Sequence, residues 1–182
     1  ATCRVRAQDA FSHIAGWTLV ADLSVPHDSF YRPSVRLKAL DGSCLLGPRV
    51  VPASQVPDPD ALTLVVSTSG NGVHTFSTGG MQRGVAQLLQ DVSAFMTLSA
   101  GDVLMLGVKF GAPQAKAGDS FSVDCAPIGT LQGQLVGAAV EVAGAGVGGA
   151  GRCCWGGVGG GGEVGGEGAA DVVGRVVCSV DF

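Results

Sequence analysis

The sequence predicts an α+β fold that is mostly β, with one long amphipathic helix. Short runs rich in β-branched residues are separated by turn residues, as where Gly70-Asn71-Gly72 lies between residues 62–69 and 73–76. Glycine and asparagine accept the positive φ that tight hairpin turns require. One segment has helical periodicity, with these apolar residues on one face over about four turns: Val85, Leu88, Leu89, Val92, Phe95 and Met96. Strands dominate without a strand–helix alternation, which argues against a parallel α/β sheet.

The other elements follow from the same periodicities and from punctuation by Gly, Asp and Pro. They are a short helix at 8–13, a mostly buried strand at 17–25, a short buried strand at 103–106, a loop at 109–117, and a second hairpin from 121–125 and 128–135. Ser77 and Thr78 offer a cap for the long helix.

The chain changes character near Val136, which predicts a division into residues 1–136 and a glycine-rich tail over 137–182. Each glycine raises the entropic cost of folding and brings no side chain to bury. We therefore expect a flexible tail, in which the valines of residues 171–177 form one short strand. A shifted reading frame is an alternative origin of so abrupt a change.

Composition excludes several classes of function. The net charge is -4, and the basic residues are not clustered as they are in nucleic-acid-binding domains. The first six residues lack the apolar run of a signal peptide, and no apolar stretch is long enough for a membrane span. The six cysteines are not spaced as a zinc site, and we expect reduced thiols. We predict a cytoplasmic protein with a small-molecule substrate and no nucleic acid or membrane partner.

Three places carry residues that are suited to chemistry. Asp22 is an acid near the end of an apolar strand, where a carboxylate is costly unless it is paired or bound to a cation; a solvent-facing strand end is the alternative. Lys38 shares a strand face with Arg36 by alternation and could stabilise an enolate-like transition state, or it could simply be solvated. Ser77 and Thr78, at a helix start, could receive a carboxylate or serve only as caps.

An ordered set of motifs resembles the fumarylacetoacetate hydrolase family over about residues 4–136. The motifs are Gly16-Trp17-Thr18 with Asp22, Tyr31-Arg32-Pro33, Lys38 with Asp41-Gly42 and Gly47-Pro48, Ser77-Thr78-Gly79-Gly80-Met81, Gly101-Asp102 with Gly107, and Gly118-Asp119 with Ile128-Gly129. The resemblance implies a mixed β-roll of the family's type, incomplete at its amino terminus. It also implies a metal-dependent decarboxylase and isomerase of 4-hydroxyphenylacetate catabolism, acting on 5-oxopent-3-ene-1,2,5-tricarboxylate and on 2-hydroxyhepta-2,4-diene-1,7-dioate.

The resemblance further implies roles for individual residues. Asp22 would be a ligand of Mg²⁺ (or Mn²⁺ or Ca²⁺), and Lys38 would be catalytic. Arg32, Ser77 and Thr78 would bind a 2-oxo or dicarboxylic acid substrate. Family members usually pair domains, so we expect a homodimer or pairing with a homologous half.

Departures from the family pattern keep two other functions open. The family's Glu-x-Glu metal ligands and histidine-bearing lid are expected upstream of Ala1. Pro26 stands near the arginine of active members, and Val108-Lys109 replaces a Thr-Pro pair. These departures favour a non-catalytic repeat or subunit that supports a catalytic half. A hydrolase acting on a carbon–carbon bond of an acylpyruvate is the other alternative.

Overall fold

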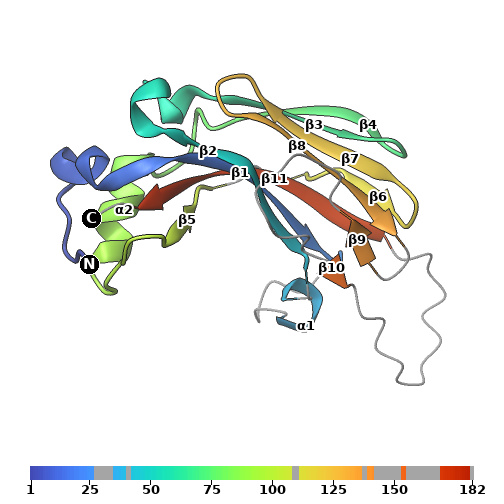
Figure 1. The fold of residues 1–182 in the computed structure, drawn as a ribbon, viewed down its shortest axis with the longest axis horizontal. Coiled ribbons are helices and arrows are strands. Elements are labelled where there is room, and N and C mark those ends of the chain that lie inside the picture. Colours follow the sequence, from blue (N-terminus) through green and yellow to red (C-terminus); the bar gives the residue numbers. More distant parts are fainter. Residues whose placement is uncertain are drawn as a thin grey trace.

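Two antiparallel β-sheets pack against each other in the computed structural model (Figure 1), which describes residues 1–26, 35–39, 42–107, 111–136, 139–141, 153–154 and 169–180. The first sheet has the order β2 (Cys44–Pro52), β1 (Ile14–Ser24), β11 (Ala169–Val180), β5 (Val103–Met105), and β6 (Gln114–Lys116) also pairs with β11. The second has the order β10 (Cys153–Cys154), β9 (Ala139–Glu141), β8 (Gly129–Val136), β7 (Ser120–Cys125), β3 (Thr63–Thr68), β4 (Gly72–Ser77). The helices are α1 (Val35–Lys38) and α2 (Val85–Ser93), with 3-10 turns η1 (Ala7–His13), η2 (Ala53–Gln55) and η3 (Pro59–Ala61).

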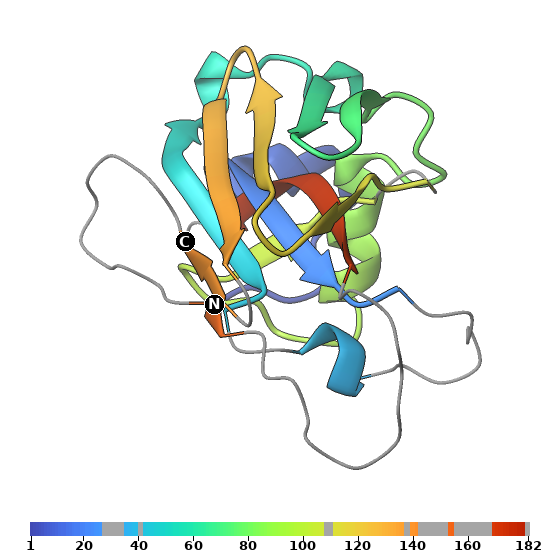
Figure 2. The same cartoon turned by 90° about the vertical axis from the view of Figure 1, so that its right-hand side faces the viewer.

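Strand β1 lies at the centre of the first sheet and is buried along almost its whole length. It pairs antiparallel with β2 on one edge and with β11 on the other. Figure 2 shows β7 and β8 of the second sheet lying across β1 and β11. A strand covered in this way carries a nearly continuous apolar run. In β1 the buried apolar residues are Trp17, Leu19, Val20, Ala21 and Leu23, interrupted by Thr18 and Asp22.

The mostly-β class and both predicted hairpins are confirmed. β3 and β4 pair from Thr63↔Ser77 to Thr68↔Gly72, and Gly72 has a φ of 76°. β7 and β8 pair from Ser120↔Gln134 to Cys125↔Gly129. The predicted first helix is the 3-10 turn η1. Short-range turn signals therefore located these elements correctly.

The long helix differs from its prediction at both ends. It begins after Gly84, so Ser77 and Thr78 do not cap it, and it ends at Ser93 rather than near Met96. Phe95, expected in the core, is 79% exposed. The backbone N–H groups of Phe95 and Met96 both bond to the Val92 carbonyl, which closes the last turn before the chain leaves the helix.

Three other sequence expectations were wrong in part. Residues 103–106 are not a buried strand, because β5 lies at a sheet edge, and of them only Leu106 is buried. The loop expected at 109–117 contains β6. The short strand expected at 171–177 is the longer β11. The tail's flexibility stays a prediction.

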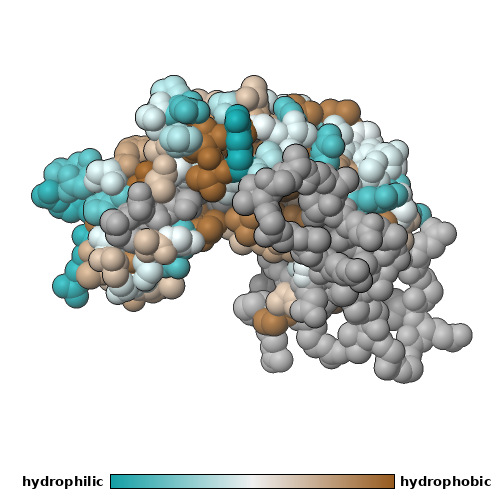
Figure 3. Space-filling model, viewed as in Figure 1, coloured by the Kyte–Doolittle hydropathy of each residue, from teal (hydrophilic) through white to brown (hydrophobic). Residues whose placement is uncertain are grey.

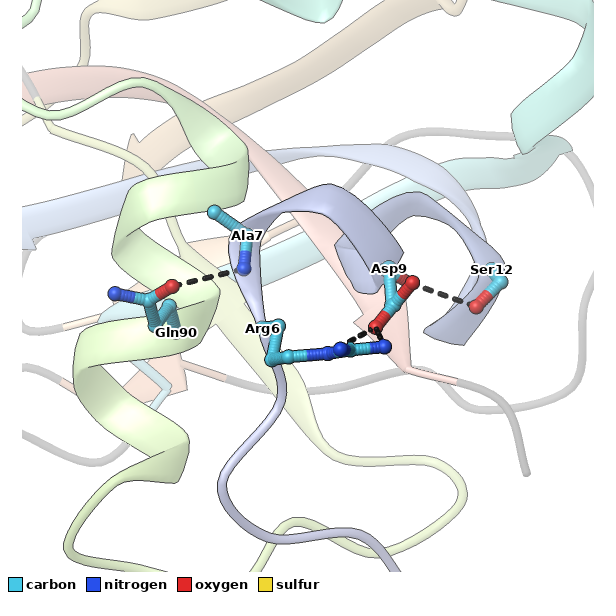
Figure 4. A network of polar contacts seen from close by, with 5 residues as sticks. All are labelled: Arg6, Ala7, Asp9, Ser12 and Gln90. Carbon is cyan, nitrogen blue, oxygen red and sulfur yellow. Dashed lines mark hydrogen bonds and ion pairs between the residues drawn. The ribbon is translucent and has the colours of Figure 1, made fainter.

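The amino-terminal segment is attached to the carboxyl-terminal half of α2 by backbone donors. The N–H of Val5 donates to Ser93 Oγ at 3.0 Å, and that of Ala7 donates to Gln90 Oε1 at 2.8 Å. Figure 4 shows the second of these bonds beside the exposed ion pair of Arg6 and Asp9 on η1. Two side chains of α2 thus hold the chain just before β1.

The two Gly-Asp pairs of the family motifs form the same turn. Gly101 and Gly118 have φ values of 89° and 93°, which favour glycine. The carboxylates of Asp102 and Asp119 accept the backbone N–H groups of Ser99 and Lys116, at 2.7 and 2.8 Å. These motif residues therefore fix turns in this fold.

The outer edge of the first sheet exposes apolar side chains. Leu46 and Val50 of β2 are both more than half exposed, and Figure 3 shows hydrophobic residues on the face that β2 crosses, away from the polar end at η1. In the part of the chain that the structure describes, no helix is long and apolar enough to cross a membrane.

Adding a methyl group at Gly16 should weaken the β1–β2 pairing. An alanine Cβ there would lie 2.4 Å from the Val51 carbonyl oxygen, which is backbone and cannot easily move. We expect Gly16→Ala to lower the free energy of unfolding by about 1–3 kcal/mol, measured by urea denaturation. In the control Gly107→Ala, the nearest atom of the described residues to the new Cβ is Met81 Sδ, at 3.8 Å. Equal losses in both variants would contradict this account.

Cys125 should be far less reactive than Cys3, although both are free thiols. Burial raises the pKa of the Cys125 thiol and the neighbouring Asp124 carboxylate raises it further, against a weaker lowering by the Ile128 backbone. Since the thiolate is the nucleophile, iodoacetamide at mildly alkaline pH should label exposed Cys3 first, as read by peptide mass spectrometry. Cys125 should react only after unfolding in urea; equal native rates would refute this.

Candidate functional site

Asp22 lies near the carboxyl end of β1 and is only 5% exposed. Its backbone pairs with Cys44 of β2 and Val173 of β11, so the sheet surrounds it on both sides. The solvent-facing alternative for Asp22 is therefore wrong. Burying a carboxylate is costly without compensating contacts, which keeps Asp22 the strongest candidate from the sequence.

The turn that carries Lys38 approaches this end of β1. The backbone N–H of Val25, three residues after Asp22, donates to the carbonyl oxygen of Leu37 at 2.9 Å. The bond from Ala39 N–H to the Val35 carbonyl oxygen closes α1 as a helical turn, so the strand alternation expected for Arg36 and Lys38 was wrong. The backbone thus brings Asp22 and the Lys38 turn together. Arg32 lies outside the described residues.

A pocket of about 740 Å³ lies beside the loop that follows β4. Its wall combines apolar and polar residues from β3, β4, the loop, α2 and the end of the segment after β5. The lining residues are Thr63, Thr75, Phe76, Ser77, Gly79, Gly80, Met81, Gln82, Arg83, Leu88 and Gly107. The volume suits a small organic acid. Arg83 supplies a positive charge at this wall and pairs with Asp91 at 2.8 Å.

Ser77 and Thr78 lie next to each other but in different surroundings. Ser77 is exposed at the pocket wall, where its Oγ accepts the backbone N–H of Gly79 at 3.0 Å. The Thr78 hydroxyl is buried; it accepts the Leu62 N–H and donates to the Pro59 carbonyl oxygen, both at 2.8 Å. Ser77 can therefore meet a ligand directly, whereas a ligand bond to Thr78 would have to replace one of these contacts.

The candidate residues form two groups rather than one. Asp22 is not among the described residues that line the pocket at Ser77. In both Figure 1 and Figure 2, α1 lies at the lower end of the molecule, while the β3–β4 hairpin that ends at Ser77 lies at the upper end. The structure therefore joins Asp22 to the Lys38 turn and Ser77 to Thr78, but does not join the two groups.

The described residues do not fit a complete divalent metal site. Within them, no three side chains of His, Cys, Asp or Glu come close enough to hold a metal ion. Hard cations such as Mg²⁺ and Ca²⁺ take at least six oxygen ligands, and Asp22 alone does not provide them. The described part of the chain is therefore insufficient to hold such an ion by itself.

Asp60 is a residue that the sequence analysis missed. Its Oδ1 accepts the backbone N–H of Val85 at 3.0 Å, at the start of α2. The run Asp58-Pro59-Asp60 does signal a turn start, and Asp58 indeed accepts the Asp60 N–H. The contact with a helix 25 residues away leaves no signal in the local pattern.

Comparison with known proteins identifies the family. The profile described as "Fumarylacetoacetate (FAA) hydrolase C-terminal" matches residues 1–136. This chain belongs to the fumarylacetoacetate hydrolase family. Over 120 residues it is 37% identical to the homoprotocatechuate catabolism bifunctional isomerase/decarboxylase of Escherichia coli, covering 66% of this chain and 27% of that protein.

Other members of the fumarylacetoacetate hydrolase family differ in the reaction that their names state. A 2,4-didehydro-3-deoxy-L-rhamnonate hydrolase from Sphingomonas sp. is 34% identical over 145 residues, covering 74% of this chain and 51% of that protein. The solved 5-carboxymethyl-2-hydroxymuconate delta-isomerase from Mycobacterium smegmatis has a TM-score of 0.63 and 29% identity, over 74% of this chain and 53% of that one. This chain thus spans between about a quarter and a half of these relatives.

Replacing Thr78 with valine should destabilise the fold, because it leaves the Leu62 N–H and the Pro59 carbonyl without their buried partner. We expect Thr78→Val to lower the free energy of unfolding by about 1–3 kcal/mol in urea denaturation. Thr78→Ser keeps the hydroxyl and should retain most of the stability. If the serine variant is as unstable as the valine variant, the hydroxyl bonds do not explain the role of Thr78.

Proposed function

We propose that this chain is part of a decarboxylase and isomerase of 4-hydroxyphenylacetate catabolism. The observation that carries the proposal is the buried Asp22 carboxylate beside the turn of Lys38. The resemblance of the motifs and the identity to the Escherichia coli enzyme support the same reaction class. The substrates would be the oxo-pentene tricarboxylate and the hydroxy-diene dioate that the family resemblance implies.

In this proposal Lys38 stabilises the charge that develops when carbon dioxide leaves the 2-oxo acid. The electron pair of the broken C–C bond is delocalised into an enolate, and a nearby ammonium group lowers the energy of that charge. The same enolate chemistry serves isomerisation, in which a proton leaves one carbon and returns to another. Arg32, outside the described residues, would bind a substrate carboxylate.

Ser77 would bind a further substrate carboxylate at the pocket wall, where Arg83 also lies. Thr78 would support this contact by holding the start of the loop, since its hydroxyl already bonds to Pro59 and Leu62. Because the structure does not join the Asp22 and Ser77 groups, we propose that a paired homologous domain completes each substrate site. The exposed Leu46 and Val50 on β2 are compatible with such pairing.

A divalent cation, Mg²⁺ or else Mn²⁺ or Ca²⁺, remains part of the proposal with Asp22 as one ligand. When bound, such an ion would polarise the 2-oxo group. The remaining ligands would come from outside the described residues.

Two other functions compete with this proposal. The first is a non-catalytic repeat or subunit, favoured by Pro26 near the place where active members carry an arginine and by Val108-Lys109 in place of a Thr-Pro pair. The second is a carbon–carbon hydrolase of acylpyruvates; the Sphingomonas relative, a hydrolase by name, supports that class.

Calorimetric titration of the full-length protein with Mg²⁺ tests the proposal most directly. We expect measurable binding that Asp22→Asn weakens by more than about tenfold, because the substitution removes a charged ligand. Asp9→Asn is the matched control, since Asp9 is an exposed carboxylate paired with Arg6.

Three results would decide against the proposed reaction. Absence of binding heat, or equal heats for the wild type and Asp22→Asn, would favour the non-catalytic repeat. Turnover of an acylpyruvate without turnover of the tricarboxylate would select the hydrolase.

A further inference from the structure

We propose that Asp60 is a positioning residue that sets the shape of the pocket beside Ser77. Asp60 does not line this pocket. It acts through the pocket loop, defined as residues 79–83, which contributes five of the lining residues. This inference rests on the proposed function in that the pocket is taken to bind substrate carboxylates.

The pocket loop is held at its first end by η3. The Thr78 hydroxyl accepts the N–H of Leu62, just after η3, and donates to the carbonyl oxygen of Pro59, the first residue of η3. The backbone N–H of Thr78 also donates to the Leu62 carbonyl oxygen, at 2.9 Å. These three bonds are buried or within the backbone, so the loop starts from a fixed point.

The same 3-10 turn holds the second end of the loop through Asp60. The Oδ1 atom of Asp60 accepts the Val85 N–H at 3.0 Å. The Oδ2 atom of Asp60 lies so close to Gly84 that a Cβ added to Gly84 would be 2.9 Å from this oxygen. The negative charge of Asp60 also lies at the positive end of the α2 dipole. Glycine at position 84 is what allows the carboxylate to approach the helix start.

Between these two ends the pocket loop has little support of its own. Among the described residues, its backbone N–H groups make two hydrogen bonds, from Gly79 to Ser77 Oγ and from Met81 to the Thr78 carbonyl oxygen at 3.4 Å. The Arg83 side chain pairs with Asp91, but both are partly exposed, and such pairs contribute little. The position of the loop therefore depends mainly on its ends, and Asp60 fixes the end that carries Arg83.

Removing the carboxylate should loosen the pocket loop and weaken substrate binding. We expect Asp60→Ala in the full-length protein to raise KM for the tricarboxylate about five- to tenfold. This is the fold-change in binding that corresponds to the free energy usually lost with a helix cap. The value of kcat should change less than about twofold, because the lost contact would stabilise the bound substrate and the transition state equally. Amide hydrogen exchange in residues 79–85 should become faster. Asp60→Asn keeps an oxygen acceptor for the Val85 N–H. This variant should therefore show the wild-type KM and the wild-type exchange rate in residues 79–85.

A second variant disturbs the same contact from the other side. Gly84 has an ordinary φ of -65°, so alanine fits its backbone and the added methyl group acts only by displacing Asp60. Gly84→Ala should therefore reproduce the raised KM and the faster exchange of Asp60→Ala.

Gln90→Ala is the matched control. It removes one side-chain bond to a backbone N–H on the same helix, the bond to Ala7 at 2.8 Å, away from the pocket (Figure 4). It should lower the melting temperature without changing KM or exchange in residues 79–85. The inference is overturned if Gln90→Ala raises KM as much as Asp60→Ala, or if Asp60→Ala leaves that exchange unchanged. A wild type that does not turn over the tricarboxylate refutes the proposed function instead, while the exchange data still decide the role of Asp60.

Discussion

The rest of the structure depends on β1 being paired on both edges and buried on both faces. Its backbone groups bond to β2 and β11, and its side chains are buried from Gly16 to Leu23. A strand in this position excludes charged side chains unless something compensates their desolvation. Asp22 places a buried carboxylate at the end of β1 where α1 lies, after a run of mostly apolar residues. An exception to local packing of this kind is where a functional residue is most expected.

Local chemistry made part of the fold predictable. The hairpin at Gly70-Asn71-Gly72 follows from residues that accept positive φ, and the turns at Gly101-Asp102 and Gly118-Asp119 follow from glycine plus a short acceptor side chain. The helical periodicity from Val85 located α2 but not its end. Phe95 and Met96 continue the apolar spacing although the chain has already left the helix, because periodicity records spacing and not whether a packing partner is present.

The candidate site was less predictable, because its contacts join segments that are distant in sequence. Ser77 and Thr78 look equivalent as adjacent hydroxyl residues, yet one lines a pocket and the other is buried between Pro59 and Leu62. The helix start that they were expected to cap is capped by Asp60, from a 3-10 turn that precedes β3. The pairing of β3 with β4 and the bonds of Thr78 to Pro59 and Leu62 bring η3 next to the loop, so the capping residue depends on tertiary structure.

Strand β11 shows how a partner determines the length of a strand. It lies outside residues 1–136 that the family profile matches, and it follows a glycine-rich run. Its valines predicted a strand only at 171–177. The observed pairing with β1 extends from Ile14↔Val180 to Ser24↔Asp171, over nearly the whole length of β1 apart from a bulge at Ala15. Residues 169–171 of β11 also pair with β6. The great majority of backbone N–H and carbonyl groups in a buried strand are hydrogen-bonded. The bounds of β11 therefore follow from the backbone partners that β1 and β6 offer more than from its own composition.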